Sequence, residues 1–396
     1  MVRVTVVGGG YGGITVAGGL DDVAEVTLVE QKDQFVHHAA ALRAAVDDIW
    51  THTIFMPYSR LLKHGRVVHG EATRVEGTTV HLANHDPIEA DYLVLATGTT
   101  YPYPAKHNIP TASLAKRRLE ETRNNLSQAK RVMLVGAGTV AIEFAGELFT
   151  NFPDMEITMV DRSPHILGSN EYAEDLRSVL TAELQQAGVQ LVLGAPLAYL
   201  PPTDIGELAP FHVETQAGVG IDADMWFLCY GAQTASGYLR ANYGDSLNSE
   251  GQVTVDEYLR VKGQNHVYAV GDITDVHESK RADAARAHAR VVVANIKAEI
   301  AGQAPSTTYT PGKMWIVLPL GVEGGASQLN GPNGESQIVG PDETSEIKGT
   351  DLMVTMVRGQ LHLPEFVLVP PTESDAADGF TQGRFSGVVG ELALMG

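Results

Sequence analysis

Two glycine-rich stretches carry the strongest chemical signal in this sequence. GGGYGG begins at Gly8 and GAGTVA begins at Gly136, each directly after an apolar run. The first glycine of such a loop permits a tight turn, the second lets a pyrophosphate approach the backbone, and the third small residue packs a helix on a strand. The N-terminus of that helix offers free N–H groups to phosphate. The spaced positions are Gly8, Gly10 and Gly13, then Gly136, Gly138 and Ala141. The sequence therefore predicts two dinucleotide-binding loops.

An acidic residue ends the next apolar run after each loop. Glu30 ends VAEVTLVE, and Asp161 ends MEITMVD. A carboxylate about 20 residues beyond the first glycine is placed to hold a ribose 2′-hydroxyl. Asp161 favours NADH because it repels a 2′-phosphate, whereas Arg162 beside it keeps NADPH as an alternative. The alternative interpretation of Glu30 and Asp161 is that both only cap the ends of strands.

Buried parallel strands are the elements that must position these residues. The runs before the loops are β-branched and apolar, as in strands covered on both faces. ADYLVLATGTT and ADMWFLCYGAQ occupy corresponding places in the two halves, and VYAVGDITD is a further strand that reaches Asp272. We expect this last strand to return to the first sheet, so that the second dinucleotide domain is an insertion in the first.

The predicted fold class is α/β, with two Rossmann-like dinucleotide-binding domains and a smaller C-terminal α+β domain. The first domain comprises residues 1–108 and 232–304, and the inserted domain comprises residues 109–231. From residue 305 to residue 396, aromatic and β-branched runs are broken by Gly and Pro, which indicates a mostly β domain with a Gly-rich tail.

Composition excludes several classes of function. The chain has 396 residues and a net charge of −20, so nucleic acid and anionic membranes are poor partners. No run of 18 apolar residues is present, and no transmembrane segment is expected. The sequence enters its first strand at once, which leads us to expect a cytoplasmic protein. Cys229 is the single cysteine, so no internal disulfide can form.

Four motifs in order carry a family likeness. VVGGGYGG, ATG, GAGTVAIEFAGEL and YAVGD together resemble the pyridine nucleotide–disulfide oxidoreductase superfamily over about residues 1 to 300. HHAAALRAAV and YTPGKMWIVLPLGVEGGASQLNG look like segments of the ferroptosis suppressor protein group, relatives of apoptosis-inducing factor. The resemblance implies non-covalent FAD, NADH or NADPH, and a quinone as acceptor. The lipidated N-terminus of animal members is missing, and the tail from about residue 370 matches no known pattern.

The resemblance also assigns binding residues, with FAD in the first domain and NAD in the inserted domain. The expected FAD residues are Gly8, Gly10, Tyr11, Gly12, Gly13, Glu30, Gln31, Arg43, Ala96, Thr97, Gly98, Gly271, Asp272, Lys280 and Ala282. The expected NAD residues are Gly136, Gly138, Thr139, Val140, Glu143, Asp161, Arg162 and Gly231. Asp272 would bind the ribityl chain of FAD, and a helix N-cap is its alternative role.

Catalytic roles follow from the same resemblance. Glu143 would reach the junction of nicotinamide and flavin, and a surface helix glutamate is the alternative. His37 and His38 would line the flavin and help protonate a reduced quinone, although 14 histidines make chance placement a real alternative. Lys280 opens a helix aimed at the flavin pyrimidine, and a cation near flavin N5 is expected at Arg43.

The sequence does not determine the electron acceptor or the oligomeric state. Trp315 is either a wall of an acceptor pocket or a core aromatic. Reduction of a quinone is the leading hypothesis, with hydride passing from NADH to FAD and two electrons passing onward. A reductase of ferredoxin or rubredoxin is the second hypothesis, and an NADH-responsive redox-sensing interaction protein is the third. No metal is expected, and a homodimer is an open alternative to a monomer.

Overall fold

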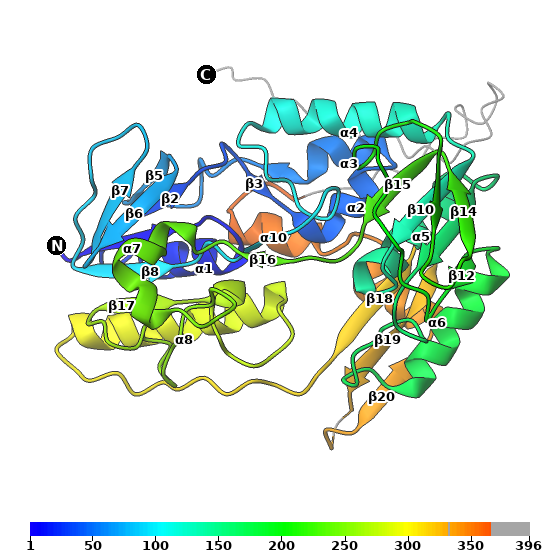
Figure 1. The fold of residues 1–396 in the computed structure, drawn as a ribbon. Coiled ribbons are helices and arrows are strands. Elements are labelled where there is room, and N and C mark those ends of the chain that lie inside the picture. The colour runs from blue at the N-terminus through cyan, green and yellow to red at the C-terminus, as the bar shows by residue number, and fades with distance from the viewer. Residues whose placement is uncertain (332, 366–396) are drawn as a thin grey trace.

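Two parallel β-sheets form the framework of the chain, and a third, antiparallel sheet lies beside the second (Figure 1). The computed structural model describes residues 1–331 and 333–365. Strands of the parallel sheets are short β-branched and apolar runs, buried along most of their length. Such runs suit strands covered on both faces, because neither face has to meet water. The fold is therefore mixed α/β, as the sequence predicts.

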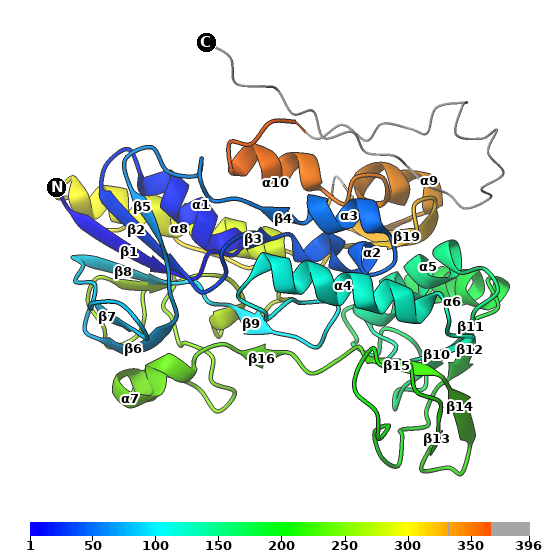
Figure 2. The ribbon, with the colours of Figure 1, turned by 90° about the horizontal axis from the view of Figure 1, so that it is seen from above.

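The first sheet has five parallel strands in the order β17-β8-β1-β2-β5. The helices α1 and α8 pack together on one of its faces (Figure 2). Val6 joins the core beneath these helices, whereas Val7 joins a smaller core beneath the hairpin β6–β7. The elements up to residue 100 are β1 (Arg3–Val7), α1 (Tyr11–Leu20), β2 (Glu25–Glu30), β3 (Phe35–Val36), η1 (His38–Ala40), α2 (Ala41–Ala44), α3 (Asp48–Thr53), β4 (Phe55–Met56), β5 (Arg66–His69), β6 (Ala72–Glu76), β7 (Thr79–Leu82), β8 (Tyr92–Leu95) and β9 (Thr99–Thr100).

The second sheet repeats this design with four parallel strands in the order β12-β11-β10-β15. Leu134 lies in the main core with helix α5, and Met133 lies in a separate core beneath the hairpin β13–β14. The elements of this part are α4 (Ala112–Leu126), β10 (Arg131–Val135), α5 (Thr139–Asn151), β11 (Glu156–Val160), α6 (Glu174–Gln186), β12 (Gln190–Val192), β13 (Phe211–Glu214), β14 (Gly220–Ala223) and β15 (Met225–Leu228).

The strand β17 returns to the first sheet after the whole second sheet has been completed. It pairs with β8, and Tyr268 lies opposite Val94. The two crossings between the sheets pair with each other, because β9 and β16 form a short antiparallel ribbon. The domain division predicted from the sequence, including its boundaries, stays a prediction. The elements of this return are β16 (Gln233–Thr234), η2 (Gly237–Leu239), α7 (Arg240–Tyr243), η3 (Gly244–Ser246), β17 (Val267–Ala269), η4 (Gly271–Ile273) and α8 (Ala282–Ile300).

The third sheet is antiparallel, in the order β18-β19-β20, and short helices follow it. β18 packs on α5, β19 packs on α6, and α10 packs back on α1 (Figure 2). The C-terminal part thus contacts both parallel-sheet units. Its elements are β18 (Ile316–Leu320), β19 (Gly324–Asn330), β20 (Ser336–Val339), α9 (Pro341–Thr344), the π-turn η5 (Ser345–Gly349) and α10 (Val354–Gln360). The predicted Gly-rich tail lies outside the described residues.

No helix within residues 1–331 and 333–365 is both long and apolar enough to cross a bilayer.

Helix α5 buries its apolar face, and it approaches β18 so closely that one position requires glycine. A Cβ on Gly146 would lie 2.5 Å from Leu320 Cα and 2.6 Å from Gly321 N. Both contact atoms belong to the backbone, so a flexible side chain cannot yield to relieve the overlap.

Gly146→Ala is expected to lower the free energy of unfolding by about 1–3 kcal/mol, because β18 must move away from α5. Gly359→Ala is the matched control, since Gly359 also lies in a helix and its added Cβ would meet no atom within 4 Å. Urea unfolding of both variants measures the difference. Equal stabilities of the two variants would show that the α5–β18 contact tolerates a side chain.

Candidate active site

The two glycine-rich loops have the same backbone geometry. Gly8 has φ of +105° and donates its N–H to Val29 O at 2.8 Å, and Gly136 has φ of +116° and donates to Val160 O at 2.7 Å. Only glycine adopts such φ values readily. A Cβ on Gly8 would also lie 2.5 Å from the carbonyl oxygen of Ala96. Each loop is thus pressed against the neighbouring strand and turns there.

Both loops are open where a phosphate would approach. The second glycines, Gly10 and Gly138, are the N-caps of α1 and α5, and neither helix has a side-chain cap. A Cβ built on either glycine would meet no atom within 4 Å. The first N–H groups of each helix therefore face space that is free of side chains. This is the arrangement that binds a pyrophosphate, and it fits a dinucleotide at each loop.

Glu30 and Asp161 hold their own loops from the end of the second strand. Glu30 accepts hydrogen bonds from Gly9 N and from Lys32 N, the second at 2.9 Å. Asp161 accepts from Ala137 N and from Ser163 N, both at 2.7 Å. Each acid therefore shapes its loop through backbone N–H groups, and the predicted ribose contact would be an additional one.

A cavity of about 210 Å³ adjoins the second loop at Asp161 and Arg162. Its walls include the rings of Tyr199 and Tyr230, which are 53% and 51% exposed. Large exposed aromatic rings beside a dinucleotide loop supply flat apolar surfaces. The cavity therefore fits the adenosine end of a nicotinamide dinucleotide.

A second polar region lies where β8 and β17 end side by side. Asp272 accepts a hydrogen bond from Thr99 Oγ1 at 2.9 Å, and Lys106 Nζ lies 3.4 Å from its carboxylate. His38 Nε2 is buried here with no hydrogen-bond partner among the described residues. A buried polar atom without a partner is costly unless a ligand supplies one. The residues present thus fit an elongated polar cofactor such as FAD. Sequence reasoning missed Lys106, which lies in the proline-rich crossing.

His37 is a neutral, fixed side chain in this structure. Its Nε2 must donate to Leu352 O at 2.7 Å because a carbonyl only accepts, so its Nδ1 accepts from the Tyr11 hydroxyl at 3.0 Å. Burial lowers the pKa of His37 to about 4 and places the pKa of His38 well below its ordinary value. Burial thus favours the neutral form of both rings, and their predicted role in protonating a quinone stays a prediction.

The structure gives Lys280 and Arg43 protein partners. Lys280 Nζ donates to Thr274 O and Val276 O, both at 2.8 Å, and burial lowers its pKa. It thereby holds the loop that follows Asp272. Arg43 points to the interface with α5, where every nitrogen of its guanidinium contacts protein. The predicted roles of Lys280 and Arg43 beside the flavin stay predictions, and any such role would come in addition to these protein contacts.

The remaining predicted residues lie at strand ends and helix starts. Thr97 follows β8, and its hydroxyl donates to Ala235 O in the returning crossing at 2.7 Å. Gln31 follows β2, and its carbonyl accepts from His69 Nε2 at 2.8 Å. Positive φ values mark the turns at Gly98, Gly231 and Gly271. The positions in or directly beside the first turn of a helix are Tyr11, Gly12, Gly13, Thr139, Val140 and Ala282.

Glu143 meets a cation that sequence reasoning missed. Lys348 Nζ lies 2.7 Å from Glu143 Oε1 and 3.5 Å from Val317 O. Burial raises the pKa of Glu143, and the neighbouring Lys348 opposes that rise. Lys348 lies in the π-turn η5, and a π-turn often occurs at a functional site. No local pattern marks this lysine, because its partner lies 205 residues earlier.

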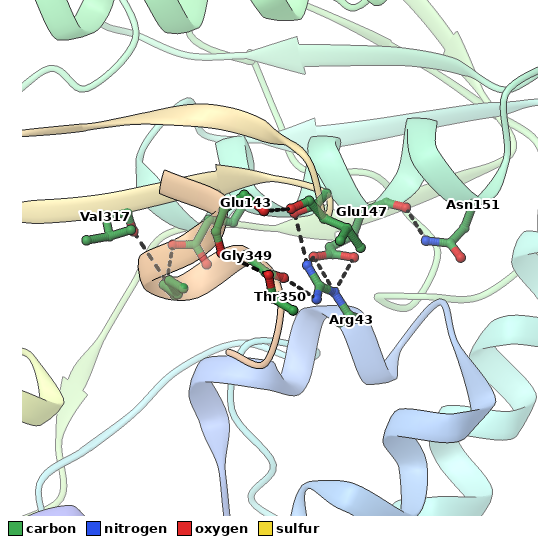
Figure 3. A network of polar contacts seen from close by, with 11 residues as sticks. Arg43, Glu143, Glu147, Asn151, Val317, Gly349 and Thr350 are labelled. Carbon is green, nitrogen blue, oxygen red and sulfur yellow. Dashed lines mark hydrogen bonds and ion pairs between the residues drawn. The ribbon is translucent and has the colours of Figure 1, made fainter. Parts of the chain in front are cut away.

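Arg43 and Glu147 form a buried ion pair one helical turn beyond Glu143. Arg43 Nε lies 3.0 Å from both carboxylate oxygens of Glu147, and the two side chains are 3% and 5% exposed. The guanidinium also donates to Gly349 O at 2.6 Å and to Gly321 O at 3.0 Å (Figure 3). This single side chain therefore joins α2, α5 and the C-terminal part.

A further cavity of about 370 Å³ lies between the start of α8 and β18. Trp315 forms part of its wall, and the Arg281 guanidinium lies 4.8 Å from the centre of that ring. Trp315 is therefore at the surface of a cavity rather than in the core. It stands two residues before Val317, whose carbonyl oxygen lies 3.5 Å from Lys348 Nζ, so one short segment lines the cavity and then contacts Lys348.

Several known proteins are similar to this chain in sequence or in fold. A family model described as pyridine nucleotide-disulphide oxidoreductase matches residues 2–289. The chain is 34% identical over 342 residues to ferroptosis suppressor protein 1 of Taeniopygia guttata, covering 83% of this chain and 89% of that protein. It is 30% identical over 319 residues to apoptosis-inducing factor homolog B of Dictyostelium discoideum, covering 75% and 81%. The solved sulfide:quinone oxidoreductase of Aquifex aeolicus has a similar fold, with a TM-score of 0.71 at 17% identity over 92% of each chain.

A buried histidine near His38 yields a prediction about pH. His107 Nδ1 and Nε2 have no hydrogen-bond partner among the described residues, and burial lowers the pKa of His107 from 6.5 to about 4. Between those values the unfolded chain binds a proton that the folded chain does not, so stability falls as the pH falls. His107→Phe is expected to reduce the stability lost between pH 7 and pH 5.

Urea unfolding at the two pH values measures this loss. His52→Gln is the control, because His52 is exposed and its loss should leave the pH dependence as it was. His37 and His38 keep part of the dependence in every variant, since burial lowers their pKa values too. A loss of stability in His107→Phe equal to that in the parent protein would contradict the assignment.

Proposed function

We propose that this chain, which belongs to the pyridine nucleotide-disulphide oxidoreductase family, is an FAD-dependent NADH oxidoreductase that reduces a quinone. The observation that carries the proposal is the partly buried Glu143–Lys348 pair, in which Glu143 lies on the helix that starts at the second loop. In the balanced reaction, NADH, a proton and a quinone become NAD⁺ and a hydroquinone. The proposal thus specifies the two cofactors, the roles of the residues that bind them, and the electron acceptor.

The first loop would hold FAD and the second would hold NADH. Asp272, supported by Thr99 and Lys106, would bind the ribityl chain of FAD, and His38 Nε2 would gain a partner from it. Asp161 would present its carboxylate to the adenosine ribose, where a 2′-phosphate would be repelled. Arg162 lines the same cavity, so NADPH remains the alternative donor.

When bound, FAD supplies the chemistry that accepts a hydride from NADH and releases electrons in pairs. The chain contributes position and charge. Lys348 would place a positive charge where reduction builds negative charge, and Glu143 would hold that ammonium in place through the 2.7 Å contact. A fixed charge in a buried site is effective because it needs no reorganisation during the reaction.

Electrons cannot leave through a cysteine pair in this protein. Cys229 is the only cysteine of the sequence, and burial raises its pKa to about 12. It is therefore a buried thiol rather than a reactive thiolate. The simplest alternative is an acceptor that takes electrons directly from the reduced cofactor. A disulphide step, which the family description mentions, would need a second cysteine.

A quinone fits the acceptor role better than an acidic electron carrier. The resemblance to the ferroptosis suppressor protein group implies a quinone as the acceptor. The net charge of −20 would repel ferredoxins, which are usually acidic. The cavity at Trp315 offers an aromatic wall, and the chain that forms this wall continues into Val317, which contacts Lys348, so we propose that the quinone binds there.

An anaerobic visible spectrum of the holoprotein tests the function. The protein should be yellow, lose colour with one equivalent of NADH, and regain it at once with 2,3-dimethoxy-5-methyl-1,4-benzoquinone. Slow recovery with this quinone would indicate a protein acceptor or a redox sensor. Colourless protein that takes up no FAD would refute the proposal at its first step.

Glu143→Gln tests the role of the Glu143–Lys348 pair. Loss of the carboxylate frees Lys348 from its position, so reduction by NADH should slow about tenfold or more, which corresponds to about 1.4 kcal/mol in the barrier. The control is Glu120→Gln, because Glu120 is an exposed glutamate of α4. Stopped-flow reduction at the parent rate, with full flavin content, would show that Glu143 has no part in the reaction.

A further inference from the structure

The Arg43–Glu147 ion pair lies directly behind the Glu143–Lys348 pair. Glu143 and Glu147 are four residues apart on α5, so their side chains share one face of that helix. Lys348 and Gly349 are neighbours in η5, and they contact Glu143 and Arg43 respectively. Glu143 therefore holds Lys348 directly, and Glu147 holds the next residue, Gly349, through Arg43.

Two hydrogen bonds fix the turn that carries Lys348. Gly349 O accepts from Arg43 Nη1 at 2.6 Å, and Ser345 Oγ donates to Val322 O at 2.6 Å. A Cβ on Gly349 would lie 2.6 Å from the same Val322 oxygen, so the turn sits tightly against the chain. Of these contacts, only the one from Arg43 reaches the turn from the first sheet's unit.

The charges of these four residues also determine which of the two acids Lys348 contacts. Two carboxylates lie one helical turn apart on α5, the partly buried Glu143 and the buried Glu147, and Lys348 contacts Glu143. Arg43 binds both oxygens of Glu147, so that acid is already neutralised. Without Arg43, the buried Glu147 would lack a counter-charge and would compete for the ammonium of Lys348.

We infer that Arg43 and Glu147 are positioning residues, which hold Lys348 against Glu143 and reserve it for that acid. The inference rests on the proposed function of the Glu143–Lys348 pair. It gives the two residues a definite task, whereas a merely structural ion pair would affect stability alone.

Opposite shifts in pH dependence test the inference. The charged groups that act on Glu143 are Lys348 of η5, Glu147 of α5 and Arg43 of α2. Removing a positive charge raises the pKa of a nearby acid, and removing a negative charge lowers it. In Arg43→Met the acidic limb of the rate of reduction by NADH should therefore move up by about one pH unit, and in Glu147→Gln it should move down by a similar amount.

Two further variants separate charge from position. Arg43→Lys keeps the positive charge but loses the paired contact with Glu147 and Gly349, so it should slow reduction about tenfold while leaving the pH limb in place. The matched control is Arg177→Met, because Arg177 is also buried and also binds backbone carbonyls, at Leu167 and Ser169. It should lower stability and leave both the rate and the pH limb unchanged.

Hydrogen–deuterium exchange gives a readout that needs no reaction. Amides of residues 345–353 should exchange at least about tenfold faster in Arg43→Met and Arg43→Lys than in the parent and in Arg177→Met. If NADH fails to reduce the parent holoprotein, the proposed function fails, and faster exchange still supports the positioning role. Shifts of the pH limb in one common direction, or unchanged exchange in the Arg43 variants, would overturn the inference.

Discussion

The buried guanidinium of Arg43 is the contact on which the relation between the three parts of the chain depends. It binds a carboxylate of α5 and two carbonyls of the C-terminal part, from a helix that belongs to the first unit. A buried charge persists only where its partners compensate for lost hydration. Because those partners come from separate parts of the chain, the parts must meet at one fixed geometry. The Glu143–Lys348 pair joins two of the same parts, since Glu143 lies on α5 and Lys348 in the C-terminal part.

Repetition of one local design explains how the chain builds two dinucleotide loops. In both, the first glycine donates to the neighbouring strand, the second glycine leaves the helix N-terminus open, and an acid binds the loop from the next strand. All of these determinants lie within one strand–helix–strand unit. Glu30 and Asp161 thus stand where strands end and bind the backbone of their loops, and the ribose contact of each stays a prediction.

Local determinants could be predicted from the sequence, and distant ones could not. The loops and the return of β17 to the first sheet follow from apolar runs that end in glycine or an acid. Lys348 was missed because nothing in its own segment marks it as a partner of Glu143. The contact between Arg43 and Glu147 was missed for a related reason: a cation on a helix gives no sign of which acid it will meet. Burial likewise fixed the charge of His37, which the type of residue leaves open.

The C-terminal part is what completes the candidate active site. The two loops are general binding devices, and by themselves they bring only nucleotides to the chain. β18, η5 and the segment before them add the ammonium of Lys348, the anchor for Arg43 and the wall of the cavity at Trp315. These groups meet the ends of α5 and α8, where a cofactor and a nicotinamide would converge. A glycine at position 146 permits the close approach of β18 to α5 that brings them there. The proposed chemistry therefore depends on how the third sheet packs on the second unit.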